Sequence, residues 1–324
     1  MILFVNQSKN ITQNCGVYLI GMQYFEALQS SKSYTYVTVP INSTIELFTT
    51  ITALNPLAVI VNYHNATMSW VNVTKLKEQF PSIPFIKLEH EFTQSSIDAY
   101  SPIKNQGFDY AICPDNTLNA SNKNVFHINR LMAEGTPASL KQNNEPVIGY
   151  QGFGFNHKGI PSIARQVVKE FEKAQLRFHI PNSYYGDPQG HLARQQIHVV
   201  QEIIQGKDIQ LHFSNDLMSS DELVKWLSEN DVNCYFYHHM HGNGIASAPD
   251  YAIAARKPIA VKQTSQLRYV WQNVPSSIID NSSLKEIIKN GFEPFELLYD
   301  KMKKEAVLGE FDLAISKIIT RHNG

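Results

Sequence analysis

Short apolar segments alternate with amphipathic ones along the whole chain, and this alternation constrains the fold more than any other feature. Strands this apolar, each followed by a helical pattern, are typical of parallel sheets that helices cover on both faces. The expected strands are 2–5, 35–39, 58–61, 84–88, 110–112 and 125–128 in a first series, and 146–151, 176–180, 209–213, 232–237 and 258–261 in a second.

The helical patterns between these strands complete two βαβ series. The first series has helical patterns at 17–28, 44–54 and 73–80, and the second has them at 160–174, 191–205, 220–229 and 250–255. The tail 295–319 is expected to be helical throughout. The polar run Lys141-Gln142-Asn143-Asn144-Glu145 separates the two series and contributes no core residues. We therefore expect an α/β protein with Rossmann-like domains at 1–143 and 144–324, the last helix crossing back to brace the first domain. The carboxyl ends of the two parallel sheets should face one another across a cleft, where ligands bind in such sheets.

Composition and charge restrict the binding partners and the cellular compartment that the sequence allows. The formal net charge of −1 offers no basic field for nucleic acid. The widely spaced Cys15, Cys113 and Cys234 indicate a reducing compartment. The N-terminus turns polar at Asn6 without a basic region, so we expect no signal peptide. No apolar run approaches the roughly 18 residues of a membrane helix. These features together predict a cytoplasmic protein without a transmembrane segment.

The segment 231–261 carries the strongest functional signal. A strand leads through a His/Gly loop into the turn Gly244-Ile245-Ala246-Ser247, and a helix is expected from Asp250. Backbone N–H groups at such a turn lie unpaired at the positive end of the helix dipole, which makes a natural phosphate site. Pro249 suits the first helical turn, where its missing N–H costs nothing. The alternative is that Ser247 and Asp250 only cap the helix.

A second glycine-rich turn follows the first strand of the second series. It runs Gly149-Tyr150-Gln151-Gly152-Phe153-Gly154 and continues to Lys158-Gly159. Glycines such as Gly154 let the backbone approach a ligand closely, and Lys158 could neutralise a phosphate. The Gly-Lys-Ser/Thr ending of a P-loop is absent. An ordinary strand-to-helix turn is the alternative, but both turns leave strands of one parallel sheet and should converge at its carboxyl edge.

Two features of the first series suggest a second ligand. Gly16 opens the first helix and allows close approach, although a plain helix start explains it equally well. His90 and Glu91 end the fourth strand and could bind sugar hydroxyls or move a proton, or could form a solvated loop pair.

The histidines His238, His239 and His241 with Cys234 suggest a zinc site, but their spacing does not suit one tetrahedral ion. We expect no metal and expect His241 to line the donor pocket.

These segments resemble the GT-B glycosyltransferases, specifically the retaining group that includes sucrose synthase and bacterial lipopolysaccharide glycosyltransferases. The resemblance lies in 148–160, in 220–232 and in the helix–strand unit 252–261 that ends in Lys257-Pro258, with a weaker match at Gly16. It implies that Lys158 contacts the donor diphosphate. The family's glutamate pair is replaced here by Asn243 and Tyr251, so Asp250 would take the ribose contact. The arginine that usually partners the lysine is missing, and Phe155 or Asn156 stands in its region.

The resemblance implies a hexosyltransferase that needs no metal and no tightly bound cofactor. It would take a UDP- or GDP-sugar as co-substrate and a glycan, lipid or small-molecule hydroxyl as acceptor, with retention of configuration. His90 and Lys158 are the expected catalytic residues. The donor would contact Gly154, Lys158, Gly244, Ile245, Ala246, Ser247, Asp250 and Tyr251, and the acceptor side would comprise Gly16, His90, Glu91 and His241. A nucleotide-sugar epimerase of the same fold and a non-catalytic nucleotide-sugar-binding protein remain alternatives.

Overall fold

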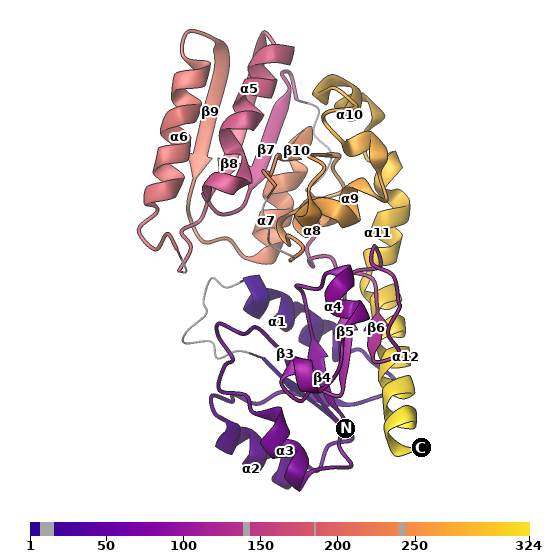
Figure 1. Ribbon diagram of the computed structural model, residues 1–324. Coiled ribbons are helices and arrows are strands. Elements are labelled where there is room, and N and C mark those ends of the chain that lie inside the picture. The colour runs from indigo at the N-terminus through magenta and orange to yellow at the C-terminus, as the bar shows by residue number, and fades with distance from the viewer. Residues whose placement is uncertain (7–15, 139–142, 185, 240–243) are drawn as a thin grey trace. The chain divides into compact units, whose positions relative to one another are not determined.

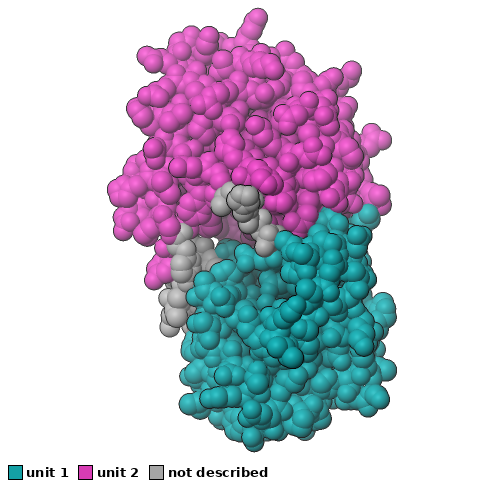
Figure 2. All heavy atoms as spheres, viewed as in Figure 1, with its two compact units in different colours: residues 1–131, 301–324 teal, residues 132–300 magenta. Residues whose placement is uncertain are grey.

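The computed structural model describes residues 1–6, 16–138, 143–184, 186–239 and 244–324. They form two compact units, unit 1 (1–131 with 301–324) and unit 2 (132–300), which Figure 2 distinguishes by colour. Each unit contains one parallel β-sheet with helices (Figure 1).

Unit 1 has a six-stranded sheet with the strand order β2-β1-β3-β4-β5-β6, in which every pairing is parallel. Its strands are β1 (Ile2–Val5), β2 (Tyr36–Val37), β3 (Ala58–Asn62), β4 (Phe85–Leu88), β5 (Tyr110–Cys113) and β6 (Val125–His127). Its helices are α1 (Gly16–Leu28), α2 (Thr44–Leu54), α3 (Val73–Gln79), α4 (Gln94–Asp98) and α12 (Lys304–Asn323). The predicted strands of the first series are confirmed.

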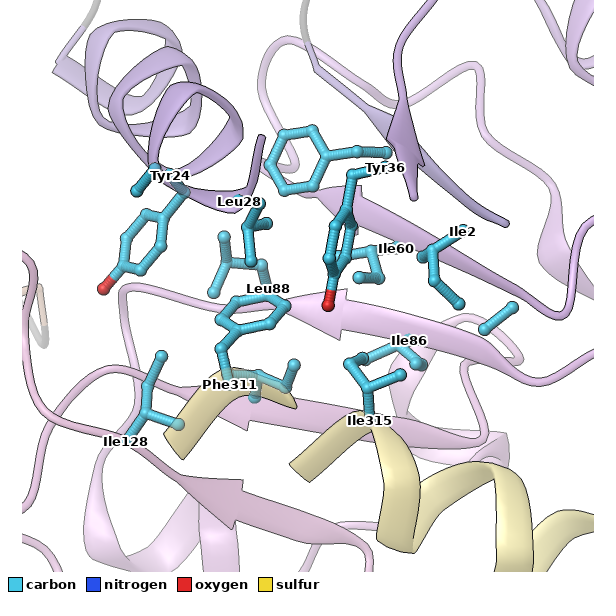
Figure 3. Packing of buried hydrophobic residues seen from close by; sticks show 14 of the residues in the cluster. Ile2, Tyr24, Leu28, Tyr36, Ile60, Ile86, Leu88, Ile128, Phe311 and Ile315 are labelled. Atoms are coloured by element: carbon cyan, nitrogen blue, oxygen red, sulfur yellow. The ribbon is translucent and has the colours of Figure 1, made fainter. Parts of the chain in front are cut away.

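The two faces of this sheet are covered by different helices. Alternate strand residues such as Ile2 and Ile60 pack with Tyr24 of α1 and with Phe311 and Ile315 of α12 (Figure 3). The intervening residues, such as Leu3 and Val59, belong to a second cluster that includes buried residues of α2 and α3. A strand buried on both faces must be apolar at every position, which explains the continuous apolar segments of the sequence.

Unit 2 has a five-stranded parallel sheet with the order β11-β10-β7-β8-β9. Its strands are β7 (Val147–Gln151), β8 (Lys173–His179), β9 (Asp208–Ser214), β10 (Val232–Tyr235) and β11 (Ile259–Val261). Its α-helices are α5 (Ile160–Glu170), α6 (His191–Ile204), α7 (Ser220–Ser228), α8 (Ala248–Ala254), α9 (Arg268–Trp271), α10 (Leu284–Asn290) and α11 (Glu296–Met302). The order reverses direction at β7, so β7 and β10 are the neighbours between which a Rossmann-like sheet places its ligand.

Two predicted helices were wrong in extent. The helix expected over 160–174 ends at Glu170, because Phe171 is extended at φ −123° and ψ 135°, and β8 then begins at Lys173. The tail expected to be helical throughout is broken at Lys303, whose φ of −60° and ψ of 147° separate α11 from α12. This break lies close to Asp300, where the chain leaves unit 2 and enters unit 1.

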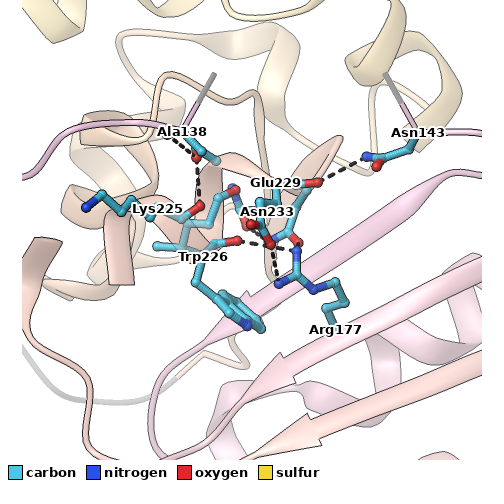
Figure 4. A network of polar contacts seen from close by, with 10 residues as sticks. Ala138, Asn143, Arg177, Lys225, Trp226, Glu229 and Asn233 are labelled. Atoms are coloured by element: carbon cyan, nitrogen blue, oxygen red, sulfur yellow. Dashed lines mark hydrogen bonds and ion pairs between the residues drawn. The ribbon is translucent and has the colours of Figure 1, made fainter. Parts of the chain in front are cut away.

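The segment before β7 is attached to α7 by its backbone and one side chain. The N–H of Thr136 donates to Asp221 Oδ1 (2.9 Å), the N–H of Ala138 to Ser228 Oγ (2.8 Å), and Asn143 Nδ2 to the carbonyl of Glu229 (3.0 Å). Figure 4 shows the last two of these bonds beside the pair between Arg177 and Glu229. These bonds group Thr136, Ala138 and Asn143 with unit 2, and the division into folding domains at 143/144 stays a prediction.

Candidate functional site

The two glycine-rich turns of unit 2 leave adjacent strands at the same edge of its sheet. β7 and β10 are parallel neighbours, with Ile148 opposite Val232 and Gly149 opposite Asn233. The first turn also contacts the segment that leads from β10 to the second turn, since the N–H of His238 donates to the carbonyl of His157 at 2.7 Å. The predicted convergence of the two turns is therefore confirmed.

Two glycines of the first turn are explained by packing. Gly159 has a φ of +66°, and a Cβ added there would lie 1.9 Å from the carbonyl oxygen of Phe236. Gly154 lies against α6, because an added Cβ would be 2.5 Å from the Cα of Ala193. The absence of side chains lets this turn pack closely against Phe236, the residue after β10, on one side and against α6 on the other. The role of Gly154 toward a ligand stays a prediction.

Lys158 supplies the cation at this edge. It ends the short 3-10 helix Asn156–Lys158, and its Nζ lies 4.0 Å from the centroid of the Tyr237 ring. Burial lowers the pKa of Lys158 to about 8, so the amine is mostly protonated at pH 7. Within the described parts of the chain no carboxylate lies within ion-pair distance of Nζ. A cation that is held by an aromatic face and lacks a protein counter-ion is suited to an anionic ligand.

The second turn is pinned by three hydrogen bonds. The N–H of Ala246 donates to the carbonyl of Gln266 (2.9 Å), and the carbonyls of Ala246 and Ala248 accept from the hydroxyls of Tyr269 (3.2 Å) and Tyr235 (3.3 Å). The amide of Ala246, expected to bind the donor, is therefore engaged within the protein.

The remaining amides of the second turn are available. For the N–H groups of Gly244, Ile245 and Ser247, no acceptor occurs among the residues that the structure describes. Up to three amides of this turn can therefore meet an anion.

The polar residues of α8 are placed differently from one another. Asp250 is 1% exposed, and its Oδ1 accepts a hydrogen bond of 2.7 Å from the Tyr269 hydroxyl. Tyr251 is half-buried. Ser247 occupies the N-cap position of α8, yet its side chain makes no capping bond. The alternative explanation of Ser247 as a cap is therefore wrong, whereas Asp250 is held inside the protein.

Among the described residues, buried polar atoms without a hydrogen-bond partner gather at the carboxyl ends of strands in both units. In unit 2 they include Gln151 Oε1, Tyr237 Oη, Thr264 Oγ1 and Gln266 Oε1, which end or follow β7, β10 and β11. In unit 1 they include His64 Nδ1, His90 Nδ1 and His127 Nε2, which end or follow β3, β4 and β6. Glu145 Oε2, before β7, is at the opposite edge. Native proteins pair nearly all such atoms, so a concentration of them at one edge points to groups that a bound molecule or water would satisfy.

His90 presents a lone pair at the edge of unit 1. Asn62 donates from Nδ2 to Asn6 Oδ1 (2.8 Å) and to the carbonyl of Val17 (2.7 Å), so its Oδ1 accepts and must receive a proton from His90 Nε2, 2.8 Å away. The other ring nitrogen, Nδ1, then carries the lone pair. Burial, with smaller contributions from Arg130 and His64, lowers the pKa of His90 to about 3. His90 is thus a neutral hydrogen-bond acceptor and a weak base.

Three residues of this cluster escaped the sequence analysis. Asn6 and Asn62 both follow or end buried strands, and Gly21 lies so close that an added Cβ would be 2.1 Å from Asn62 Nδ2. An asparagine at the end of an apolar strand was the available signal for the pair. Gly21 carries no signal in the sequence, because its role depends on how α1 packs.

The other expected residues of the acceptor side are more exposed. Gly16 is the first residue of α1 and is half-exposed. Glu91 is exposed, and its N–H donates to Glu89 Oε1 at 3.0 Å. His241 lies outside the described residues.

In the described ranges, no group of three or more His, Cys, Asp or Glu residues is arranged to hold a metal ion. A helix long and apolar enough to cross a membrane is likewise missing from those ranges.

Comparison with known proteins shows similarity in structure and not in sequence. No protein-family model matches the chain, and no curated protein does. The lipopolysaccharide outer core galactosyltransferase WaaB in its apo form aligns with a TM-score of 0.64 at 10% identity, over 98% of this chain and 99% of its own. HepE from Anabaena in complex with UDP-glucose aligns with a TM-score of 0.56 at 11% identity, over 99% and 96%. The N-terminal domain of Candida albicans trehalose-6-phosphate phosphatase aligns with a TM-score of 0.68 at 9% identity, over 98% and 96%.

Likeness at such low identity establishes the fold. The chain has the GT-B architecture of two Rossmann-like α/β units that these glycosyltransferases share, as the sequence predicted. The narrower resemblance to the retaining group stays a prediction, and the activity must be argued from the site.

Proposed function

We propose that unit 2 binds a nucleotide diphosphate sugar and that the protein transfers the sugar to a hydroxyl acceptor. The observation that carries this proposal is the placement of Lys158, a half-buried cation without a carboxylate partner among the described residues, where two turns meet at the carboxyl edge of the sheet. Its fold is that of glycosyltransferases, and one structural neighbour was solved with UDP-glucose.

Lys158 and the free amides of the second turn supply the chemistry on the donor side. When the bond between the sugar and the diphosphate breaks, negative charge grows on the leaving phosphate. The Lys158 ammonium and the N–H groups of Gly244, Ile245 and Ser247 would stabilise that charge, because fixed donors at a water-poor site need no reorganisation. Metal independence and retention of configuration are part of this proposal and rest on the sequence resemblance.

The geometry refines two of the expected roles. Asp250 is bound by Tyr269, so we assign it to fixing α8 and assign the nucleoside contact to Tyr251. His90 is neutral, and its Nδ1 accepts hydrogen bonds, so we assign it to orienting a hydroxyl of the substrate in unit 1. Gly16 and Glu91 complete the acceptor side of this proposal.

Binding of nucleoside diphosphates tests the donor site. A ligand that binds the native state raises its melting temperature, so UDP or GDP should stabilise the wild-type chain. Lys158→Ala should weaken that diphosphate by about tenfold to a hundredfold, the usual worth of a hydrogen bond to a charged group. Lys169→Ala is the matched control, since Lys169 is exposed in the last turn of the neighbouring α5. If Lys158→Ala bound the diphosphate with the affinity of the wild type, the proposed diphosphate site would be wrong.

Turnover separates the transferase from a non-catalytic binding protein. The non-catalytic binding protein is the second candidate function, and it is favoured by Asn243 and Tyr251 at the positions of the family's glutamates. The same fold also occurs in the N-terminal domain of a protein named as a phosphatase. Release of UDP from UDP-glucose in the presence of hydroxyl acceptors, with and without EDTA, distinguishes the two. Acceptor-dependent release that survives EDTA supports metal-independent transfer, whereas tight binding without release supports the binding protein.

A further inference from the structure

Two hydroxyl residues at N-cap positions in unit 2 do not cap their helices. Ser247 precedes α8, and Thr264 precedes the 3-10 helix Ser265–Leu267, and neither side chain accepts a hydrogen bond from the following turn. The other Ser, Thr and Asn N-caps of the described helices all do so: Ser43, Asn72, Thr93, Ser219 and Ser283. Capping is the usual reason for such a residue at this position, so a different reason is needed at the carboxyl edge of unit 2.

Thr264 and Gln266 make hydrogen bonds to other elements through their backbones, and Gln266 holds the second turn in this way. The carbonyl of Thr264 accepts from Trp271 Nε1 (2.9 Å), and the carbonyl of Gln266 accepts from the N–H of Ala246 (2.9 Å). Thr264 is 6% exposed and Gln266 is 9% exposed. Even so, Thr264 Oγ1 and Gln266 Oε1 have no partner within the described part of the chain. Each residue therefore keeps a buried polar atom free beside the turn that offers its amides.

A third unpartnered group belongs to the same edge. Tyr237 is 1% exposed, its hydroxyl has no partner among the described residues, and its ring carries the Lys158 ammonium. β11 pairs with β10, with Val261 opposite Tyr235, so the residues after these strands emerge side by side. The unpartnered polar atoms of the described residues at this edge are thus the hydroxyls of Thr264 and Tyr237 and the amide oxygens of Gln266 and Gln151, all neutral.

The chemistry of these groups identifies their ligand. Hydroxyls both donate and accept, and the amide oxygen accepts, which matches the hydroxyl groups of an uncharged sugar. Two charged side chains of this region are engaged within the protein, Asp250 with Tyr269 and Arg268 with the carbonyl of Ser265. We infer that Thr264 and Gln266 bind hydroxyl groups of the donor's hexose and so determine which sugar unit 2 accepts. This inference rests on the proposed function and adds the residues that select the sugar.

Calorimetric titration of the full chain with UDP, UDP-glucose, GDP and GDP-mannose tests the inference. Thr264→Val and Gln266→Met keep side-chain size and remove the unpartnered atoms. Each variant should bind the sugar nucleotide about fivefold to tenfold more weakly, as expected for the loss of one hydrogen bond. Its affinity for the plain diphosphate should stay within about twofold of the wild-type value. The melting temperature of Thr264→Val should stay equal or rise, because no cap is lost. Ser283→Ala is the control, and it should lower the melting temperature without changing either affinity.

The outcomes separate this inference from the proposed function. Unchanged sugar-nucleotide affinity in both variants, or an equal loss for the plain diphosphate, overturns the assignment to the sugar while diphosphate binding stands. A drop in melting temperature for Thr264→Val as large as that for Ser283→Ala also overturns it, because the hydroxyl would then be structural. If wild type binds neither diphosphate nor sugar nucleotide, the proposed function fails and the inference fails with it.

Discussion

The ammonium of Lys158 lies 4.0 Å from the centre of the Tyr237 ring, and the hydroxyl of that ring has no partner within the described residues. One aromatic side chain thus holds the cation of the site on its face and leaves its polar end free. The face contributes to stability through the cation–π interaction, whereas the unpaired buried hydroxyl detracts from it. The two parts of Tyr237 can be separated by mutation.

Tyr237→Phe should leave the free energy of unfolding unchanged or slightly higher, because it keeps the ring and removes the unpaired hydroxyl. Tyr237→Leu should lower it by about 1–3 kcal/mol, because both the cation–π interaction and aromatic packing are lost. Urea denaturation at pH 7 measures both variants. Equal destabilisation by Phe and Leu would show that the hydroxyl has a structural partner.

Affinity for UDP should fall as pH rises through about 8, because the Lys158 ammonium loses its proton there. Phosphate groups are already ionised above pH of roughly 7, so the ligand contributes little to the change. Titrations between pH 7 and 9.5 measure the effect, and Lys158→Arg should abolish it because a guanidinium stays charged.

The effect of Lys158 on the free energy of unfolding has the opposite sign. The unfolded lysine binds more protons between its folded and ordinary pKa, so unfolding free energy contributed by this group rises with pH in that window.

Gly159→Ala should destabilise the protein much more than Gly206→Ala. Both glycines have positive φ, +66° and +72°, so each alanine adopts a left-handed backbone at a cost of about 1–2 kcal/mol. Only the Cβ at position 159 meets an obstacle, the Phe236 carbonyl, and the resulting shift adds about 1–3 kcal/mol. Urea denaturation compares the pair. Equal losses would mean that the turn relaxes away from β10 without cost.

Because His90 is held neutral in the folded state, the free energy of unfolding should fall as the pH is lowered. The pKa of His90 is lowered to about 3 in the folded state, so the unfolded chain binds more protons between that value and the ordinary pKa near 6.5. The stability that the neutral ring contributes is complete above about pH 6.5 and is lost as pH falls toward 3. Unfolding free energies at pH 7 and pH 5 should differ less in His90→Gln than in wild type. An NMR titration in which the His90 ring protonates near pH 6.5 would contradict this.

Continuous apolar strands and the two glycine-rich turns were enough to predict the sheets and the meeting point of the turns. Their signals are local, since a strand buried on both faces and a turn that needs positive φ each restrict their own residues. Lys158 was found because it stands in such a turn. Its cation–π partner was not, because Tyr237 looks like any other residue of a buried strand.

The errors in the roles of Ala246 and Asp250 came from contacts with residues elsewhere in the chain. The N–H of Ala246 donates to the carbonyl of Gln266, and the carboxylate of Asp250 accepts from the hydroxyl of Tyr269. The sequence around Ala246 and Asp250 gives no sign of either bond. Thr264 and Gln266 belong to no motif, and they stand out only once their unpaired atoms are located beside the turn. The break at Lys303 was missed because the helical pattern continues through it.

The helix α12 supplies Val307, Phe311, Ile315 and Ile318 to a core whose other members are mostly residues 2–131. During synthesis one face of the unit 1 sheet therefore stays exposed to water until the residues of α12 have been made. Translation that stops near position 300 should leave an apolar surface open to chaperones and proteases, even though every strand of that sheet has already been made.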